Sequence, residues 1–207
     1  MSGLRRSGGS WRDRQERDPY VLKSRRDGWR SRAVYKLEQI NAKEKILYPG
    51  MTCVDLGSAP GSWSQYVTAS LGGRVRIIAV DLLPMDSLPS VDFLQGDFTE
   101  DAVLAELLSK LGESGADLVM SDLAPNISGT KAVDQPKSMY LAELALDLVS
   151  QVLKRKGNFV CKLFQGTGTD EFIALTRKSF AKVRVMKPDA SRAGSSEVYL
   201  VARNYRL

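Results

Sequence analysis

A lysine interrupts an apolar run in the last quarter of the sequence. The stretch FVCKLFQG, residues 159–166, has the composition of a buried β-strand, yet Lys162 stands near its middle. Lysine is rarely buried without a partner, because an unpaired charge is costly to remove from water. The position therefore predicts carboxylates beside this amine. Such an amine can hold or move a proton, and the chain has no histidine that could do so instead.

Three further charged side chains stand where a parallel sheet would bring them to Lys162. Asp122 follows the apolar run LVM at the end of one predicted strand, and Glu197 begins the last one. Lys36 lies on a predicted helix before the first strand. If the four converge, the burial of Lys162 is tolerable and the cluster is a candidate active site. A purely structural ion pair is the alternative, although charged groups are seldom the most stabilising choice for a core.

A second group of residues has the pattern of a nucleoside-binding site. In DLGSAPGSW, residues 55–63, Gly57 and Gly61 bracket a turn into a helix, where glycine lets the backbone approach a ligand closely. Asp81 and Asp97 end the next two predicted strands, where carboxylates can accept hydrogen bonds from ribose hydroxyls and an adenine amino group. Taken singly, each feature is also explained as a packing turn, a solvated strand end or a helix cap. Because the spacing is not the dinucleotide-binding G-x-G-x-x-G, S-adenosylmethionine fits the combination best.

The elements that must position these residues alternate between strand and helix patterns. The strand-like stretches are residues 51–57, 74–82, 91–97, 116–123, 158–164, 182–188 and 197–204. The helix-like stretches are residues 31–43, 62–71, 99–112, a long one beginning near residue 134, and 169–180. Thr99 and Asp134 are the expected caps of the third and fourth helices. The alternation predicts an α/β fold, a Rossmann-like, mostly parallel seven-stranded sheet with helices on both faces and an antiparallel last strand.

The positive charge of the chain is concentrated at its N-terminal end. Residues 1–36 contain eleven lysines and arginines and four acidic residues, a net charge of +7, whereas the remainder carries −1. We expect residues 1–30 to be a basic, mobile arm and residues 31–207 to be the folded domain. A basic arm on a near-neutral domain favours a polyanionic partner such as RNA. The arginines expected to contact phosphates are Arg5, Arg6, Arg12, Arg14, Arg25, Arg26, Arg30 and Arg32.

The composition excludes several kinds of chemistry. Without histidine, Ser-His and Cys-His catalysis are impossible, and with only two cysteines a zinc site is improbable, so no metal is expected. Cys53 and Cys161 lie in apolar strand-like runs, which is typical of buried structural thiols. No apolar run is long enough to span a membrane, and no secretory signal is recognisable, so we expect a cytoplasmic protein.

Seven stretches together closely resemble the bacterial FtsJ/RrmJ family of ribose 2′-O-methyltransferases, which act on large-subunit ribosomal RNA. They are SRAVYKL, VDLGSAPGSWSQYV, DLLPM, VDFLQGDF, MSDLAPNISGT, FVCKLFQG and PDASRAGSSEVYLVA, between residues 30 and 202. The family's Lys-Asp-Lys-Glu tetrad falls on Lys36, Asp122, Lys162 and Glu197. Its cofactor-binding positions fall on Gly61, Trp63, Asp81, Asp97 and Asp122. Ser62 stands where relatives often have a second glycine.

The resemblance implies S-adenosylmethionine-dependent 2′-O-methylation of a uridine ribose in 23S ribosomal RNA, on the assembled or nearly assembled large subunit. Separately, we expect a monomer. We expect Lys162 to act as the base or to orient the hydroxyl. Burial and Lys36 favour its neutral amine, whereas Asp122 and Glu197 favour the ammonium. Lys36 would position the target ribose or its phosphate, and Glu197 would orient the lysines.

Three alternatives remain open. The first is a ribose 2′-O-methyltransferase for transfer RNA, because related enzymes share the tetrad. The second is a nicotinamide-dependent oxidoreductase, which the missing G-x-G-x-x-G disfavours. The third is a non-catalytic RNA-binding assembly factor, which the intact tetrad disfavours.

Overall fold

A seven-stranded sheet forms the centre of the molecule, in the order β3-β2-β1-β4-β5-β7-β6. The computed structural model describes residues 17–125 and 128–207. The strands are β1 (Met51–Leu56), β2 (Val75–Asp81), β3 (Val91–Gln95), β4 (Ala116–Ser121), β5 (Leu153–Phe164), β6 (Phe180–Met186) and β7 (Glu197–Tyr205). Strands β1 to β5 pair in parallel, whereas β7 is antiparallel to both β5 and β6. The predicted fold class is therefore confirmed.

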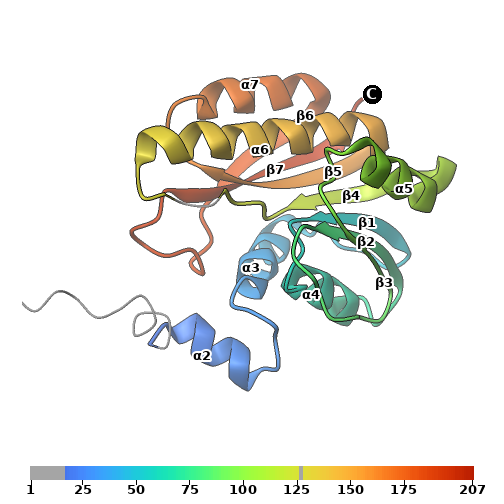
Figure 1. Cartoon of the computed structure of the whole chain (residues 1–207), viewed down its shortest axis with the longest axis horizontal. Helices are drawn as coiled ribbons and strands as arrows, with labels where there is room; N and C mark the ends of the chain where they lie inside the picture. Colours follow the sequence, from blue (N-terminus) through green and yellow to red (C-terminus); the bar gives the residue numbers. More distant parts are fainter. Residues whose placement is uncertain (1–16, 126–127) are drawn as a thin grey trace, which may run out of the picture.

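Helices cover both faces of the sheet. They are α2 (Pro19–Arg26), α3 (Val34–Glu44), α4 (Ser62–Ser70), α5 (Asp101–Leu111), α6 (Lys131–Val152) and α7 (Thr169–Ser179), with a short 3-10 turn, η1 (Gly112–Ser114), after α5. Figure 1 shows α6 and α7 above the sheet and α3 and α4 below it. One apolar core joins α5, α6 and α7 to the upper face, and a second joins α3 and α4 to the lower face. No helix of the described residues is long and apolar enough to cross a membrane.

The carboxyl ends of the parallel strands form one edge of the sheet. The strand order reverses direction between β1 and β4, and ligands of such sheets bind in the crevice beyond this switch point. The Asp122 amide donates to Leu56 O over 3.1 Å and joins the two strand ends there. Because β7 runs antiparallel, its first residue, Glu197, pairs with Phe164 near the end of β5. The start of the last strand thereby reaches the same edge.

Both predicted helix caps are wrong, because the side chains involved make tighter local turns. Thr99 precedes α5, whose N-cap is Glu100, and its amide and hydroxyl donate to Asp97 Oδ1 over 2.9 and 2.7 Å. Helix α6 begins before Asp134, with Thr130 at the N-cap. The Asp134 carboxylate lies in the first turn and accepts hydrogen bonds from the amides that precede the helix, at Ser128 and Gly129.

Part of the basic arm is folded against the domain. Residues 19–26 form the helix α2, for which Asp18 is the N-cap, with its side chain accepting from the Tyr20 amide. Figure 1 shows α2 beside α3 at the lower end of the molecule. The expected boundary after residue 30 therefore does not separate an unstructured arm from the domain in the described residues. Residues 1–16 of the expected arm, with Arg5, Arg6, Arg12 and Arg14, lie outside them.

Candidate active site

The four tetrad side chains converge at the carboxyl edge of the sheet. Lys162 Nζ lies 2.9 Å from Asp122 Oδ1 and 3.9 Å from Glu197 Oε2, and it donates to the Asp122 carbonyl over 2.8 Å. Lys36 Nζ lies 2.8 and 2.9 Å from the two carboxylate oxygens of Glu197. Lys162 is 9 % exposed, so the predicted burial of this lysine is correct. The cluster is a chain of three ion pairs, Asp122–Lys162, Lys162–Glu197 and Glu197–Lys36.

The two-residue period of the strands explains this convergence. On β5, Lys162 follows Val160, and both point to the face that α3 and α4 cover. Tyr199 of β7 lies directly opposite Lys162 and belongs to the same face. Helix α3 brings Lys36 from below. Trp63 of α4 fixes α3, because its indole Nε1 donates to Ala33 O over 2.9 Å.

The electrostatic environment keeps Asp122 ionised. Burial alone would raise its pKa, but the charges of Lys162 and Lys36 and a hydrogen bond from Tyr199 outweigh that effect and lower it. The Tyr199 hydroxyl lies 2.6 Å from Asp122 Oδ1. Burial raises the pKa of Tyr199 well above its usual value, so this hydroxyl keeps its proton and donates. One carboxylate thus faces an amine and a phenol at the same time.

The sequence analysis did not identify two residues that contact the tetrad, Tyr199 and Ser191. Tyr199 lies two residues after Glu197 on the same strand face, and that spacing was the available signal. Ser191 donates its hydroxyl to Glu197 Oε1 over 2.8 Å and comes from the loop between β6 and β7. No periodic pattern marks a loop residue of this kind, so only the structure could place it.

The turn after β1 has a backbone that requires glycine. Gly57 has φ 71°, and a Cβ there would lie 3.1 Å from the amide nitrogen of Leu123. Gly61 has φ 99°, and a Cβ would lie 2.6 Å from Nη1 of Arg30. That guanidinium donates to the carbonyls of Pro60 and, across the loop after β2, Asp86. Arg30, which was expected to contact RNA, therefore joins the loop after β1 to the loop after β2.

The two predicted ribose- and adenine-binding carboxylates lie at neighbouring strand ends. Asp81 Oδ2 accepts from the Ala59 amide over 2.9 Å, and its Oδ1 accepts from the Leu83 amide over 2.8 Å. Asp97 follows β3, and the Gly96 amide donates to Asp81 O over 2.9 Å. Both carboxylates are partly exposed beside the turn that contains Gly57 and Gly61. The predicted nucleoside-binding residues therefore share one edge.

Buried polar atoms beneath this turn fit a polar ligand. In the described part of the chain, Asp55 Oδ1 and Ser58 Oγ are buried and make no hydrogen bond. The other oxygen of Asp55 accepts from the Ser64 hydroxyl over 2.7 Å, and burial raises the pKa of this acid to about 7. Unpaired buried groups are uncommon in proteins. These two, with the glycine turn, are what the hydroxyl and amino groups of a nucleoside could pair with.

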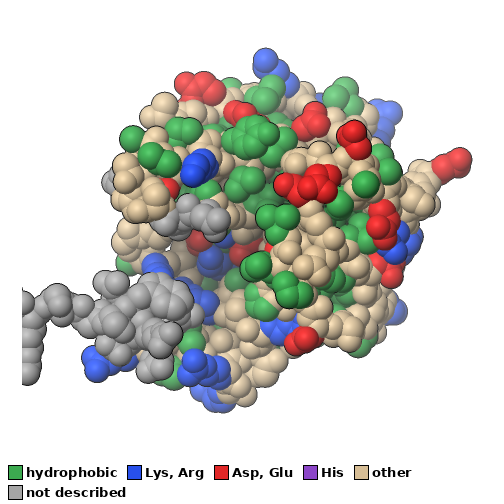
Figure 2. All heavy atoms as spheres, viewed as in Figure 1, with side chains coloured by type: hydrophobic (Ala, Val, Ile, Leu, Met, Phe, Trp, Pro, Cys, Tyr) green, Lys and Arg blue, Asp and Glu red, His purple; other side chains and the backbone are tan. Residues whose placement is uncertain are grey.

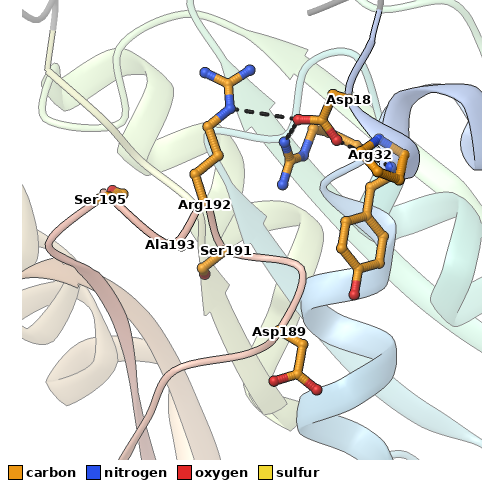
Figure 3. A pocket seen from close by; sticks show the side chains of 10 residues that line it. Asp18, Arg32, Asp189, Ser191, Arg192, Ala193 and Ser195 are labelled. Atoms are coloured by element: carbon orange, nitrogen blue, oxygen red, sulfur yellow. Dashed lines mark hydrogen bonds and ion pairs between the residues drawn. The ribbon is translucent and has the colours of Figure 1, made fainter. Parts of the chain in front are cut away.

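Gly194 and Ser195, which shortly precede Glu197, line two cavities. One, of about 750 Å³, lies between the start of α6, the loop after β5 and residues 194–196. The other, of about 670 Å³, lies between α2 and the loop before β7 (Figure 3). On the face drawn in Figure 2, Lys and Arg side chains gather on the lower part of the molecule beside a hollow.

The prediction for the two cysteines is confirmed. Cys53 and Cys161 are free and buried, as expected, and burial raises the pKa of both thiols. Within residues 17–125 and 128–207, no group of three or more acidic or cysteine side chains is arranged to hold a metal ion.

A doubly wound sheet with an antiparallel last strand, a glycine turn after β1 and acids at the ends of β2 and β4 defines the Rossmann-like methyltransferase class. The chain belongs to the FtsJ-like methyltransferase family, which it matches over residues 29–205. It is 55 % identical, over 95 % of its length and 94 % of the relative's, to the ribosomal RNA large subunit methyltransferase E of Pseudomonas fluorescens strain Pf0-1.

Solved structures agree on the fold. A chain described as a ribosomal RNA methyltransferase from Plasmodium falciparum is 29 % identical and superposes with a TM-score of 0.77, covering 86 % of this chain and 98 % of that one. A chain of a fibrillarin/Nop5p complex is 14 % identical, with a TM-score of 0.56 and 85 % of each chain covered, and shows the fold alone.

Proposed function

We propose that this protein transfers a methyl group from S-adenosylmethionine to the ribose 2′-hydroxyl of a uridine in 23S ribosomal RNA, within an assembled or nearly assembled large subunit. The observation that carries the proposal is the convergence of Lys36, Asp122, Lys162 and Glu197 beside the nucleoside edge. The name of the 55 %-identical relative supports large-subunit ribosomal RNA as the substrate. The enzyme would work in the cytoplasm as a monomer.

The cofactor would lie along the carboxyl edge of β1 to β4. Asp81 would accept from the ribose hydroxyls, and Asp97 from the adenine amino group, with Gly57, Gly61 and Trp63 shaping the turn and Asp122 closing the site. When bound, S-adenosylmethionine supplies a methyl group on a positively charged sulfur, which makes the methyl carbon an electrophile. The unpaired buried atoms of Asp55 and Ser58 support polar contacts there.

The tetrad would prepare the hydroxyl. An alcohol is a weak nucleophile, so its oxygen must be aligned with the methyl carbon and its proton must leave as the new bond forms. Lys162 would hold this oxygen in place or take its proton. Asp122 and Glu197 fix the position of Lys162, and Lys36 contacts the target ribose or its phosphate. Alignment alone is worth up to about 7–11 kcal/mol in intramolecular reactions.

The substrate is tested by comparing RNAs directly. Purified protein is incubated with radiolabelled S-adenosylmethionine and, separately, with transfer RNA, free ribosomal RNA and large subunits from cells that lack the gene. The labelled nucleosides are then identified after digestion. We expect 2′-O-methyluridine from large subunits. Label in transfer RNA alone, or on a base rather than a ribose, would overturn the proposal.

A further inference from the structure

Two arginines and one aspartate meet at the mouth of the 670 Å³ cavity beside the catalytic centre. Arg32 precedes α3, Arg192 lies in the loop between β6 and β7, and Asp18 precedes α2. Asp18 Oδ2 accepts a hydrogen bond from Arg32 Nη1 and lies 3.5 Å from Arg192 Nε. Figure 3 shows both arginine side chains directed toward this carboxylate.

The same loop connects the cavity to the reacting groups. Arg32 Nη2 also donates to Ala190 O, and the next residue, Ser191, donates its hydroxyl to Glu197 Oε1. Glu197 in turn pairs with Lys36 and Lys162. The loop between β6 and β7 therefore contacts both the arginine pair and the tetrad.

The two guanidinium groups form an anion-binding site, and the Asp18 carboxylate is the anion bound there. Guanidinium groups bind carboxylate and phosphate oxygens in the same geometry. Burial lowers the pKa of Arg32, and the neighbouring charge of Arg192 lowers it further. The Asp18 and Arg32 side chains are 10 % and 16 % exposed, whereas Arg192 is 51 % exposed. Asp18 and Arg32 are thus largely buried, whereas Arg192 is open to solvent.

We propose that Arg32 and Arg192 form a binding site for an RNA phosphate near the target ribose, and that the Asp18 carboxylate occupies this site until RNA displaces it. The helix α2 then acts as a latch, because the residue that caps it also closes the phosphate site. The 3.5 Å contact to Arg192 is longer than a strong hydrogen bond, so exchange for a phosphate loses little on that side. This inference rests on the proposed RNA substrate.

The test measures the affinity of the full chain for a short fluorescein-labelled oligouridylate by fluorescence anisotropy. In Asp18→Asn the side chain can still cap α2, because asparagine is as good an N-cap as aspartate. Asp27→Asn is the matched control, since Asp27 ends the same helix and pairs with Lys23 and Arg26 outside the cavity. We expect Asp18→Asn to bind about three- to tenfold more tightly, and Asp27→Asn to change less than about twofold.

A double-variant cycle assigns any gain to the arginine pair. Arg192→Ala removes a half-exposed side chain and should weaken binding, whereas Arg177→Ala, on the distant helix α7, should not. When Asp18→Asn is added to Arg192→Ala, the affinity for the oligouridylate should rise by no more than it does in the Asp27→Asn control. Equal affinities of Asp18→Asn and Asp27→Asn, or a gain that persists without Arg192, would overturn the inference.

Methylation of large subunits by the unaltered protein separates the two proposals. If that methylation occurs while Asp18→Asn behaves like Asp27→Asn, the latch alone is wrong. If the unaltered protein neither binds the oligonucleotide nor methylates subunits, both proposals are wrong.

Discussion

Strands β4 and β5 carry a lysine–aspartate pair at each end, and the two pairs have the same length. At the amino end, Lys154 Nζ lies 2.9 Å from Asp117 Oδ1, and at the carboxyl end Lys162 Nζ lies 2.9 Å from Asp122 Oδ1. The difference is in the surroundings. The first lysine side chain is 34 % exposed and the second 8 %. In the described residues, the buried pair also meets a second lysine and a second carboxylate, and the Lys154–Asp117 pair does not. A tyrosine lies beside each pair, Tyr199 at Asp122 and Tyr48 at Asp117.

The comparison shows that an ion pair alone does not indicate function. Asp117 also accepts from the Thr52 amide over 2.7 Å, so its pair fastens β1, β4 and β5 together. A partly exposed pair of this kind contributes up to about 1 kcal/mol to stability. Desolvating two amines and two carboxylates together is costly, and clusters of this kind are enriched at functional sites.

The largest effect is expected from Asp122→Asn. The asparagine side chain has the same shape as aspartate but no negative charge. It therefore no longer balances the charge of Lys162, and it is a weaker acceptor for the Tyr199 hydroxyl. We expect the rate of methyl transfer to fall about 10²- to 10⁴-fold, the range that positioned acid–base groups supply. Asp117→Asn should leave the rate within about twofold and lower only the melting temperature. Equal rates for the two variants in single-turnover assays would remove the distinction between the two ends.

The next largest effect is expected on the affinity for S-adenosylmethionine rather than on the tetrad. Asp81→Ala removes a carboxylate that orders the turn at Ala59 and is expected on the ribose. We expect the affinity for S-adenosylmethionine to fall about 10- to 100-fold, since a charged hydrogen bond is worth about 1.5–3 kcal/mol. Isothermal titration calorimetry measures it, with the exposed Asp86→Asn as the control. A normal affinity with a lost rate would place Asp81 in the chemistry instead.

Tyr199→Phe should have a smaller effect on the same reaction. It removes the 2.6 Å hydrogen bond to Asp122 Oδ1 without changing charge or shape. We expect about a tenfold lower rate, with affinity for the cofactor unchanged. Because this bond helps to lower the pKa of Asp122, its loss raises that pKa, and the acidic limb of the pH–rate profile moves to higher pH. Tyr205→Phe, at the other end of β7, should move neither quantity.

The smallest effect is a change in how stability depends on pH. Burial raises the pKa of Asp55 from 3.8 to about 7, so between these values the folded state binds more protons than the unfolded state. The free energy of unfolding must then fall as pH rises through this window, by up to about 1.4 kcal/mol per unit from this group. Asp55→Asn should flatten the slope in urea titrations, and the exposed Asp92→Asn should not. A slope unchanged by Asp55→Asn would show that the acid is ionised throughout.

Much of the fold and the tetrad could be predicted because both rest on local patterns. The alternation of strand and helix residues fixed the sheet, and an amine inside FVCKLF required carboxylates. The helix α2 was missed, because PYVLKSRR has no apolar stripe and is held in part by the long-range contact between Asp18 and Arg192. Strand β5 begins at Leu153 rather than near residue 158, where its register to β4 shifts, and no composition pattern marks that irregularity.

The proposal that Lys162 performs chemistry, rather than cofactor binding or structural support, can be tested against the other lysine pair of β5. Its most direct test compares Lys162→Ala with Lys154→Ala in single-turnover methyl transfer at saturating S-adenosylmethionine, with cofactor affinity measured on the same preparations. The account predicts that Lys162→Ala abolishes transfer and binds the cofactor nearly normally, while Lys154→Ala transfers at the unaltered rate. Substantial transfer by folded Lys162→Ala, or equal losses in both variants, would contradict it.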